Sequence, residues 1–572
     1  MGVMEKSPEN PMKSLPASLS QLHSGMLSSL RFTAIALALL LGACSSNPLP
    51  KVSIGKTHFI EGVNDRSLHA DNISRDLATA QSACEHLSTT PEAYNTAVES
   101  FIMGLQKKVS PHQWTKPLQV KGPSGAWEIS FDQQPLGKQG LPEWSPGFFD
   151  SFTPSRSFKL DRFYTHVKGK GVGVPCVLTL EDTTAIRADR SFRPNNGIYA
   201  PGTVLLEFGK PPSTNAATPV RVRIVNTMKV RKFKVAGSER DLAYDTTSMV
   251  EANLNNTYIV KNGLTGLLRP DKRMEDLGLF GLNTYDPKKI PVVFVHGLNS
   301  SPKIWSNIVN EIYSDPELNA HYQPLLFIYP SGLSVPGAAS RFRDSLVKYR
   351  AKWDPKGGDA NFDRMIIVGH SMGGLLTRLQ VIDSGEELRK AFFTRPIAEN
   401  GWLTADEKIR YQQSLVFKPV PYVKRAVFVA VPHRGSKIAD IGIVQLLVRL
   451  IKLPINATDL VSRAVLSGPD MLNPELARYR SLGLRSVDML SPDHPYFKAL
   501  DSCPIVVPFH SIIGDRGKTN AKERSDGVVP YWSAHLDKAE SEMIVPYGHS
   551  CTGKHETLDE IVRILKLHAA KN

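Results

Sequence analysis

The sequence predicts an α/β fold with a mostly parallel sheet in the C-terminal half, preceded by a smaller α+β domain. From about residue 287 onward, near-continuous apolar runs alternate with helical stretches, as expected for strands that are covered on both faces. Between about residues 114 and 235 the apolar runs are shorter and Gly, Pro, Asn and Asp separate them, which is typical of antiparallel strands.

The length and composition of the chain fit this division. A single hydrophobic core stops growing at roughly 250–300 residues, whereas this chain has 572. Its 41% hydrophobic and 22% charged residues are those of a globular protein. The formal charge of +14 is modest for this length and includes no long Lys/Arg block, so it favours solubility and does not predict nucleic-acid binding.

The N-terminus resembles an export signal. The run FTAIALALLLGACSS has an apolar core of about ten residues, whereas a membrane-spanning helix needs about 20. The run ends in LGAC, which resembles a bacterial lipobox, and this resemblance implies cleavage before Cys44 and lipidation of that cysteine. Ser45 in the next position then favours export to the outer membrane. A plain signal peptide is the alternative, and translation starts at either Met1 or Met26.

Four further cysteines would remain after lipidation of Cys44, in a compartment where disulfides persist. Their order along the chain suggests a Cys84–Cys176 pair and a Cys503–Cys551 pair. Four cysteines allow three pairings, so the sequence alone does not fix the connectivity.

The N-terminal half predicts a helical hairpin followed by antiparallel strands. NISRDLATAQSACEHL and PEAYNTAVESFIMGLQ carry apolar residues at helical spacing, and strands are expected at AWEISF, PCVLTL, TVLLEF and VRVRIV. The segment VRVRIVNTMKVRKFKV alternates apolar and basic residues, so one face of the sheet is expected to be cationic. That face either binds lipid phosphates or is an ordinary solvated surface.

The C-terminal half predicts six strands, at PVVFVHG, PLLFIYPSG, RMIIVGH, RAVFVAVP, IVVPFHSIIG and SEMIVPYG. Residues 384–424 and 435–501 are too many for simple crossovers, so insertions above the strand ends are expected. The stretch GIVQLLVRLIKLP in the second insertion is either a lid that opens on lipid or a core helix.

The pattern G-x-S-x-G at residues 369–373 carries the clearest chemical signal. It stands between the predicted strand RMIIV and the helical stretch GLLTRLQVI, the context in which such a turn lifts a serine above a sheet. Ser371 is therefore the candidate nucleophile. The backbone N–H groups of Met372 and of Leu298, which follows the turn VVFVHG, are the candidate oxyanion donors. His296 precedes the nucleophile and is expected to brace that turn.

A carboxylate and a histidine should follow the serine in this kind of fold. Asp526, in RSDGVVPYWSAHL, is preferred as the acid, and Asp515 is the competing carboxylate. The stretch VPYGHSCTGKHETLDE offers two histidines. His549 leaves the last predicted strand at the carboxyl edge of the sheet, where sites in open α/β sheets lie. His555 falls in the first turn of the closing helix, so His549 is the candidate base.

These motifs resemble those of bacterial lipases and esterases of the α/β-hydrolase family, in the branch that includes GPI inositol-deacylase-like hydrolases. VVFVHGLNSSPKIW, IIVGHSMGGLLTRLQ, VAVPHRGS, SDGVVPYWSAHL and IVPYGHS carry the resemblance. It implies the α/β-hydrolase fold with helical lid insertions, Asp526 as the acid and His549 as the base. Calcium-dependent bacterial lipases have an Asp at the position of Cys551, so no calcium site is implied and no cofactor is expected.

The expected function is hydrolysis of lipid or other acyl esters through an acyl-serine intermediate, in an outer-membrane lipoprotein of the cell envelope. An acyltransferase or thioesterase with the same three residues is one alternative, and a non-catalytic scaffold lipoprotein is another. The complete set of nucleophile, acid, base and oxyanion turn favours an enzyme. The expected segments are a signal peptide at 1–43, a lipidated tether at 44–72, an N-terminal domain at 73–275 and a catalytic domain at 276–572.

Overall fold

The structure is a computed structural model of the chain. It describes residues 67–69, 71–87, 91–132, 145–180, 192, 198–255, 270–283, 285–401, 403–436, 473–475, 492–517 and 524–570. The signal, Cys44, the predicted tether up to residue 66 and the stretch GIVQLLVRLIKLP lie outside these residues, whereas the last residues of the predicted tether form β1 and begin α2. Residues 57–572 form one compact unit, so the predicted boundary between residues 275 and 276 stays a prediction. Of the helices that the structure describes, none has the length and apolar character needed to cross a lipid bilayer.

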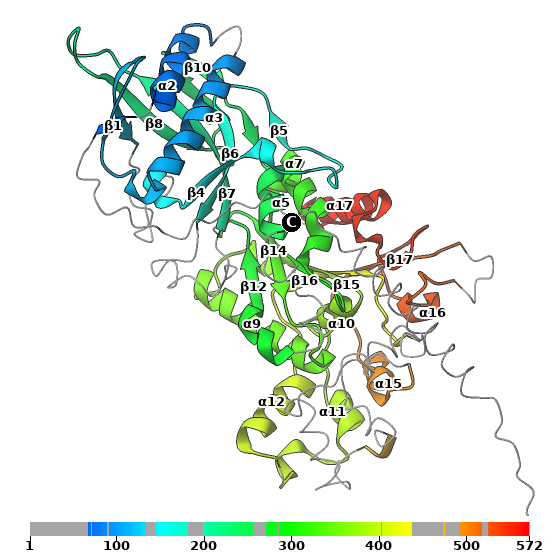
Figure 1. The fold of residues 1–572 in the computed structure, drawn as a ribbon. Coiled ribbons are helices and arrows are strands. Elements are labelled where there is room, and N and C mark those ends of the chain that lie inside the picture. The colour runs from blue at the N-terminus through cyan, green and yellow to red at the C-terminus, as the bar shows by residue number, and fades with distance from the viewer. Residues whose placement is uncertain are drawn as a thin grey trace, which may run out of the picture. The chain divides into compact units, whose positions relative to one another are not determined.

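The first part of the chain forms a helical hairpin on a seven-stranded sheet (Figure 1). The predicted hairpin is confirmed, because α2 (Asp71–Cys84) packs against α3 (Pro91–Lys108). The strands follow the order β1-β2-β3-β8-β7-β6-β4. Their bounds are β1 Ser67–His69, β2 Leu118–Gly122, β3 Gly125–Phe131, β4 Ser151–Pro154, β6 Val174–Leu180, β7 Ile198–Phe208 and β8 Thr218–Asn226.

This sheet is mixed, which corrects the prediction of a purely antiparallel one. The β1–β2 and β3–β8 pairs are parallel, and the other pairs are antiparallel. The reason is the β7–β8 hairpin, which returns β8 to the free edge of β3 in the same direction as β3. Two small pairs complete this part: β5 (Lys168–Gly169) with β11 (Tyr244–Asp245), and β9 (Lys232–Val235) with β10 (Ser238–Asp241).

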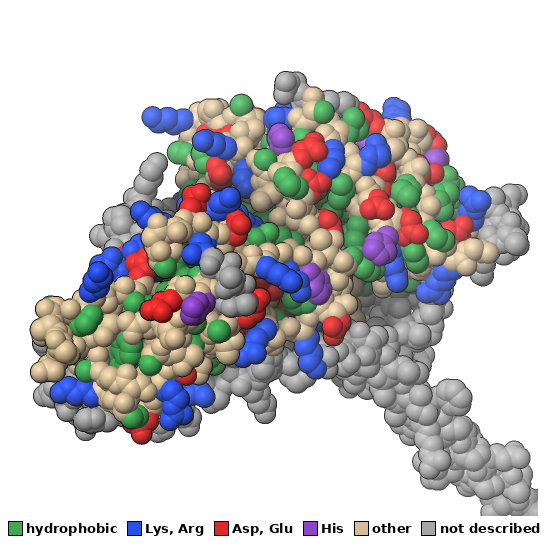
Figure 2. Space-filling model, turned by 90° about the horizontal axis from the view of Figure 1, so that it is seen from above, with side chains coloured by type: hydrophobic (Ala, Val, Ile, Leu, Met, Phe, Trp, Pro, Cys, Tyr) green, Lys and Arg blue, Asp and Glu red, His purple; other side chains and the backbone are tan. Residues whose placement is uncertain are grey.

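The predicted cationic strand face is partly neutralised. Arg223 of β8 pairs with Asp132 and Glu207, with N–O distances of 3.0 and 3.1 Å. On the face of the molecule in Figure 2, Lys and Arg side chains are interspersed with Asp and Glu. The ion pairs of Arg223 favour an ordinary solvated surface at this strand face.

The second sheet has the order β12-β14-β13-β15-β16-β17-β18. The six predicted strands are confirmed and are parallel to one another. The edge strand β12 was not predicted and is antiparallel to β14. The bounds are β12 Gly278–Gly281, β13 Ile290–Val295, β14 Tyr322–Ile328, β15 Met365–His370, β16 Val423–Val429, β17 Phe509–Gly514 and β18 Ser541–Val545.

Helices cover both faces of this sheet, because alternate strand residues point to opposite sides. Val293 and Val295 of β13 share a core with α9 and α10, whereas Val292 and Phe294 share another with α5, α7 and α17. The helices are α5 Thr247–Asn255, α7 Ser306–Ser314, α8 Pro316–His321, α9 Val335–Trp353, α10 Met372–Arg378, α11 Glu387–Phe392, α12 Ala405–Leu415, α15 Pro495–Asp501, α16 Tyr531–Ala534 and α17 His555–Ala570.

The first predicted insertion, residues 384–424, contains α11, the short 3-10 helix Ile397–Glu399 and α12. Thr404 caps α12, because its hydroxyl accepts from the N–H of Glu407 and the Glu407 carboxylate accepts from the N–H of Thr404. Within the second, residues 435–501, the described residues include α15.

The predicted disulfides are wrong, since the four described cysteines are free. Cys503 lies in the core on the α10 side of the second sheet, whereas Cys551 lies in the core on the opposite side. The sheet therefore separates the two thiols. Burial raises the pKa of Cys84 to about 11 and that of Cys551 to about 12, so neither is a reactive thiolate at neutral pH.

We expect a reductant to leave the melting temperature unchanged within about 1 °C, because the four described cysteines form no disulfide that would constrain the unfolded chain. Alkylation in denaturant without prior reduction should modify all four of these cysteines, which mass mapping would check. A drop of several degrees in dithiothreitol, or protection of a cysteine pair from alkylation, would contradict the structure.

Candidate active site

Ser371 occupies a strained turn between β15 and α10. Its backbone angles are φ 54° and ψ −125°, a region that residues other than glycine rarely adopt. Its N–H donates to the carbonyl of Val429 at 3.0 Å, which ties the turn to β16. A Cβ on Gly373 would lie 2.3 Å from the carbonyl oxygen of His296, and one on Gly369 would lie 2.4 Å from Thr377 Oγ1. Glycine at both positions therefore lets the turn pack against its neighbours.

Ser371, His549 and Asp526 form a continuous hydrogen-bonded chain. His549 Nε2 lies 2.8 Å from Ser371 Oγ, and His549 Nδ1 lies 2.7 Å from Asp526 Oδ2. The other carboxylate oxygen of the fully buried Asp526 accepts from the N–H groups of Val528 and Val529, at 2.8 and 2.6 Å. In this network a neutral imidazole donates from Nδ1 to the carboxylate and accepts the serine hydroxyl at Nε2.

Three glycines that the sequence analysis did not single out shape the loops of the acid and the histidine. A Cβ on Gly514, the last residue of β17, would lie 2.8 Å from both Asp526 Cβ and the carbonyl oxygen of Tyr547. A Cβ on Gly527 or Gly548 would meet the Arg516 guanidinium, at 2.3 and 2.9 Å. These glycines let the two loops lie close together.

Asp515, the competing carboxylate, lies outside this chain of hydrogen bonds. Its Oδ1 accepts from the N–H of Gly517 at 3.0 Å, and its Oδ2 lies 3.5 Å from Arg524 Nε. The carboxylate therefore closes the loop before Asp526.

The predicted oxyanion turn lies against the nucleophile. A Cβ on Gly297 would be 2.9 Å from Ser371 Cβ, so only a glycine lets the backbone approach this closely. Asn299 has φ 48° and donates its N–H to Ser331 Oγ at 3.1 Å, which fixes the turn on the far side of Leu298. Met372 directly follows Ser371 as the first residue of α10. The structure thus brings Met372 and the turn that leads into Leu298 next to Ser371.

His296 braces this turn, as expected. Its ring stacks on Tyr329 with centroids 4.5 Å apart, and the Tyr329 hydroxyl donates to the carbonyl of His296 at 2.9 Å. Its Nδ1 lies 3.0 Å from the carbonyl oxygen of Gly297. Burial lowers the pKa of His296 to about 4, so the ring is neutral near pH 7.

His370 contacts the histidine loop, a role that the sequence analysis missed. Its Nε2 donates to the carbonyl of His549 at 2.9 Å. Burial, followed by the neighbouring His549, lowers the pKa of His370 to about 3. A neutral imidazole therefore joins the serine turn to the His549 loop. The only sequence signal was its place inside the G-x-S-x-G pattern.

His555 lies away from the triad, at the start of α17. Its ring centroid is 3.7 Å from that of Tyr164.

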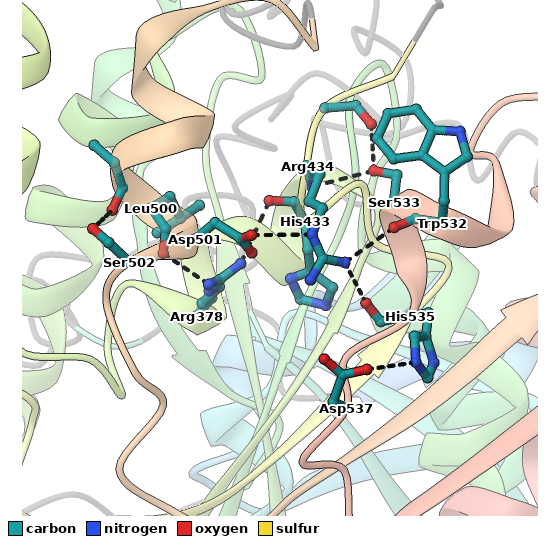
Figure 3. A network of polar contacts seen from close by, with 12 residues as sticks. Arg378, His433, Arg434, Leu500, Asp501, Ser502, Trp532, Ser533, His535 and Asp537 are labelled. Atoms are coloured by element: carbon teal, nitrogen blue, oxygen red, sulfur yellow. Dashed lines mark hydrogen bonds and ion pairs between the residues drawn. The ribbon is translucent and has the colours of Figure 1, made fainter.

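A polar network joins the two ends of the second insertion to α10 and α16 (Figure 3). Arg434, after β16, contacts Asp501 of α15 at 3.2 Å and donates to the carbonyls of Trp532 and His535 at 3.0 and 2.7 Å. Arg378, on the helix that begins beside Ser371, donates to the carbonyl of Leu500 at 2.8 Å. The residues on either side of the insertion are therefore held together.

The sheet and the site define the class. A serine turn after β15, an acid after β17 and a histidine after β18 are the arrangement of the α/β-hydrolase fold.

Comparisons with known proteins do not assign the chain to a particular family within this fold. No protein-family model and no curated protein matches the chain. Lipase BlEst2 of Bacillus licheniformis, in its mature form, is 18% identical over 49% of this chain and 93% of that one, with a TM-score of 0.28. Lipase 1 from Pelosinus fermentans is 14% identical over 50% and 100%, with a TM-score of 0.31. A lipase-esterase related protein from Clostridium acetobutylicum is 14% identical over 51% and 99%, with a TM-score of 0.26. TM-scores this low do not establish a shared fold, so the class rests on the strand order and the triad.

Proposed function

We propose that the protein is a serine carboxylic-ester hydrolase that cleaves lipid or other acyl esters. The observation that carries this proposal is the hydrogen-bonded chain from Asp526 through His549 to Ser371, on a strained turn at the carboxyl edge of the sheet. Such a chain activates a serine hydroxyl, which is otherwise a weak nucleophile.

The reaction then proceeds in two halves. His549 Nε2 takes the hydroxyl proton while Ser371 Oγ attacks the ester carbonyl, and the N–H groups of Leu298 and Met372 stabilise the oxyanion. His549 next gives its proton to the leaving alcohol, which leaves an acyl group on Ser371. A water molecule, deprotonated by His549, attacks this acyl-enzyme, and collapse of the second oxyanion releases the carboxylic acid and restores the hydroxyl. Asp526 stabilises the imidazolium in both halves.

The envelope location is also part of the proposal. The lipobox-like LGAC after a short apolar run supports a lipid anchor at Cys44 and an outer-membrane lipoprotein. An anchored enzyme meets acyl esters at the membrane surface, which supports lipids as substrates.

We expect a fluorophosphonate probe to label the mature protein, because the probe reacts only with activated serines. Steady-state rates on p-nitrophenyl esters of graded acyl length should then give the chain preference that separates a lipase from an esterase. Thioesters and alcohol acceptors in the same panel test the alternative activities. Hydrolysis of no ester, or absence of labelling, would contradict the proposal.

A further inference from the structure

Residues 162–165, here the bracing segment, lie far from the nucleophile in sequence but contact elements that lead to two parts of the site. One contact is with α7, which follows the oxyanion turn. The other is with the first residue of α17, which follows the His549 loop. The compact unit formed by residues 57–572 contains all of these elements.

Two asparagines on the polar face of α7 form hydrogen bonds with the backbone of the bracing segment. Asn307 Oδ1 accepts from the N–H of Tyr164 at 3.3 Å, and Asn307 Nδ2 donates to the carbonyl of Arg162 at 3.2 Å. One turn later, Asn310 Nδ2 donates to the carbonyl of Thr165 at 2.7 Å. Because these side chains are three residues apart, they lie on one face of the helix.

Losing these contacts should be energetically unfavourable, because the side chains around them are buried. Asn310 is 1% exposed, and its Oδ1 accepts from the hydroxyl of Thr247 at 2.8 Å. Phe163 is 5% exposed and packs in the core that contains Ile308 of α7. A buried amide that loses its partner keeps its desolvation cost, so the segment and α7 should move together.

The position of α7 affects the position of the oxyanion turn, because only a short stretch of chain connects the two. The chain from Gly297 reaches α7 through a single 3-10 helix, Pro302–Trp305. Trp305 is fully buried against Phe294 of β13, with ring centroids 5.3 Å apart. Because this connection is short and Trp305 is buried, we expect a shift of α7 to displace Leu298 relative to Ser371.

The second contact reaches the histidine loop. The rings of Tyr164 and His555 are in contact, with centroids 3.7 Å apart and planes tilted by 33°, and His555 begins α17. Between His549 and His555 the chain forms a tight 3-10 turn, in which the N–H of Lys554 donates to the carbonyl of Cys551 at 3.0 Å. The hydroxyl of Tyr547, on the other side of His549, donates to Glu556 at 3.0 Å, which closes the loop.

We propose that the bracing segment is a positioning element for the proposed hydrolysis, on which this inference rests. It holds the oxyanion turn and the His549 loop at a fixed separation. Asn307 and Tyr164 touch no reacting atom and are positioning residues. Misplacement of a catalytic group by about 1 Å can cost 100-fold in rate, so a partial loss of bracing should lower kcat while substrate binding stays unchanged.

Asn307→Ala in the full-length protein tests this inference. It removes both amide contacts, and we expect kcat on a short-chain p-nitrophenyl ester to fall about tenfold with KM unchanged within about twofold. Asn361→Ala is the matched control. Asn361 Nδ2 also donates to a backbone carbonyl, that of Pro287 at 3.0 Å. Asn361 precedes β15, whereas Ser371 follows it, so the control lies at the opposite edge of the sheet.

A second pair of variants keeps the test valid if Asn307→Ala does not fold. Tyr164 is 46% exposed, so replacing its ring should leave the fold intact. Tyr164→Ala should lower kcat severalfold, whereas Tyr164→Phe retains the ring and should restore the rate.

The outcomes separate the two proposals. If the wild-type protein is neither labelled by a fluorophosphonate nor active on esters, the proposed function fails. If the wild type is active and both Asn307→Ala and Tyr164→Ala match Asn361→Ala in kcat and KM, the bracing role alone is overturned. An equal loss of kcat in Tyr164→Ala and Tyr164→Phe would also overturn the role of the ring contact between Tyr164 and His555.

Discussion

Ser371→Ala should lower kcat for ester hydrolysis by roughly 10,000-fold or more, the largest effect expected of any single substitution in this protein. The change removes the attacking oxygen and leaves His549 without a proton to transfer. Fluorophosphonate labelling should disappear with the activity, which gel fluorescence measures directly. Backbone strain at φ 54° is similar for serine and alanine, so the melting temperature should change little.

Undiminished labelling of Ser371→Ala would show that the probe reacts elsewhere and would contradict the assignment. The control is the melting temperature of the same preparation, because an unfolded variant would also lose its label.

His549→Ala should lower kcat by a comparable factor, whereas His555→Ala should keep at least roughly a tenth of the wild-type value. Only His549 lies within hydrogen-bond distance of both Ser371 Oγ and the Asp526 carboxylate, among the contacts of the described residues. The ring of His555 contacts that of Tyr164, so under the proposed bracing role its loss should cost no more than the loss of the Tyr164 ring. Steady-state kinetics of the two variants on one ester measures the difference.

If His555→Ala lost as much activity as His549→Ala, the assignment of the base would be wrong. Their melting temperatures should be measured alongside, since both residues lie near the start of α17.

The sequence predicted those elements of the fold that have a distinctive local pattern of apolar residues. Strands covered on both faces are apolar throughout, so β13 to β18 were visible as runs. The edge strand β12 escaped notice because GLFG is short and has glycine at both ends. The parallel β3–β8 pairing was missed for a different reason: its partners are about 90 residues apart, and no local pattern records such a contact.

At the site, too, residues in local motifs were predicted, whereas contacts between residues far apart in the sequence were not. Ser371, Asp526 and His549 stand in motifs whose order along the chain is diagnostic, and the structure brings them together. The contact of His370 with the His549 carbonyl depends on two loops that meet only after folding. The cysteines show the limit most plainly, because Cys503 and Cys551 lie on opposite sides of a sheet that sequence order does not reveal.

The contact between Arg434 and Asp501 bears on how far the length of the second insertion can change without disturbing the triad. It joins Arg434, which follows β16, to α15, and Arg378 ties Leu500 of α15 to the helix that begins beside Ser371. Changing the length of a loop whose ends are already held costs little, about 0.6 kcal/mol for each doubling. We therefore expect changes in length between residues 437 and 472 to leave the geometry of the triad unchanged, whereas Tyr496 and Phe497 of α15 are buried in the core and should be kept.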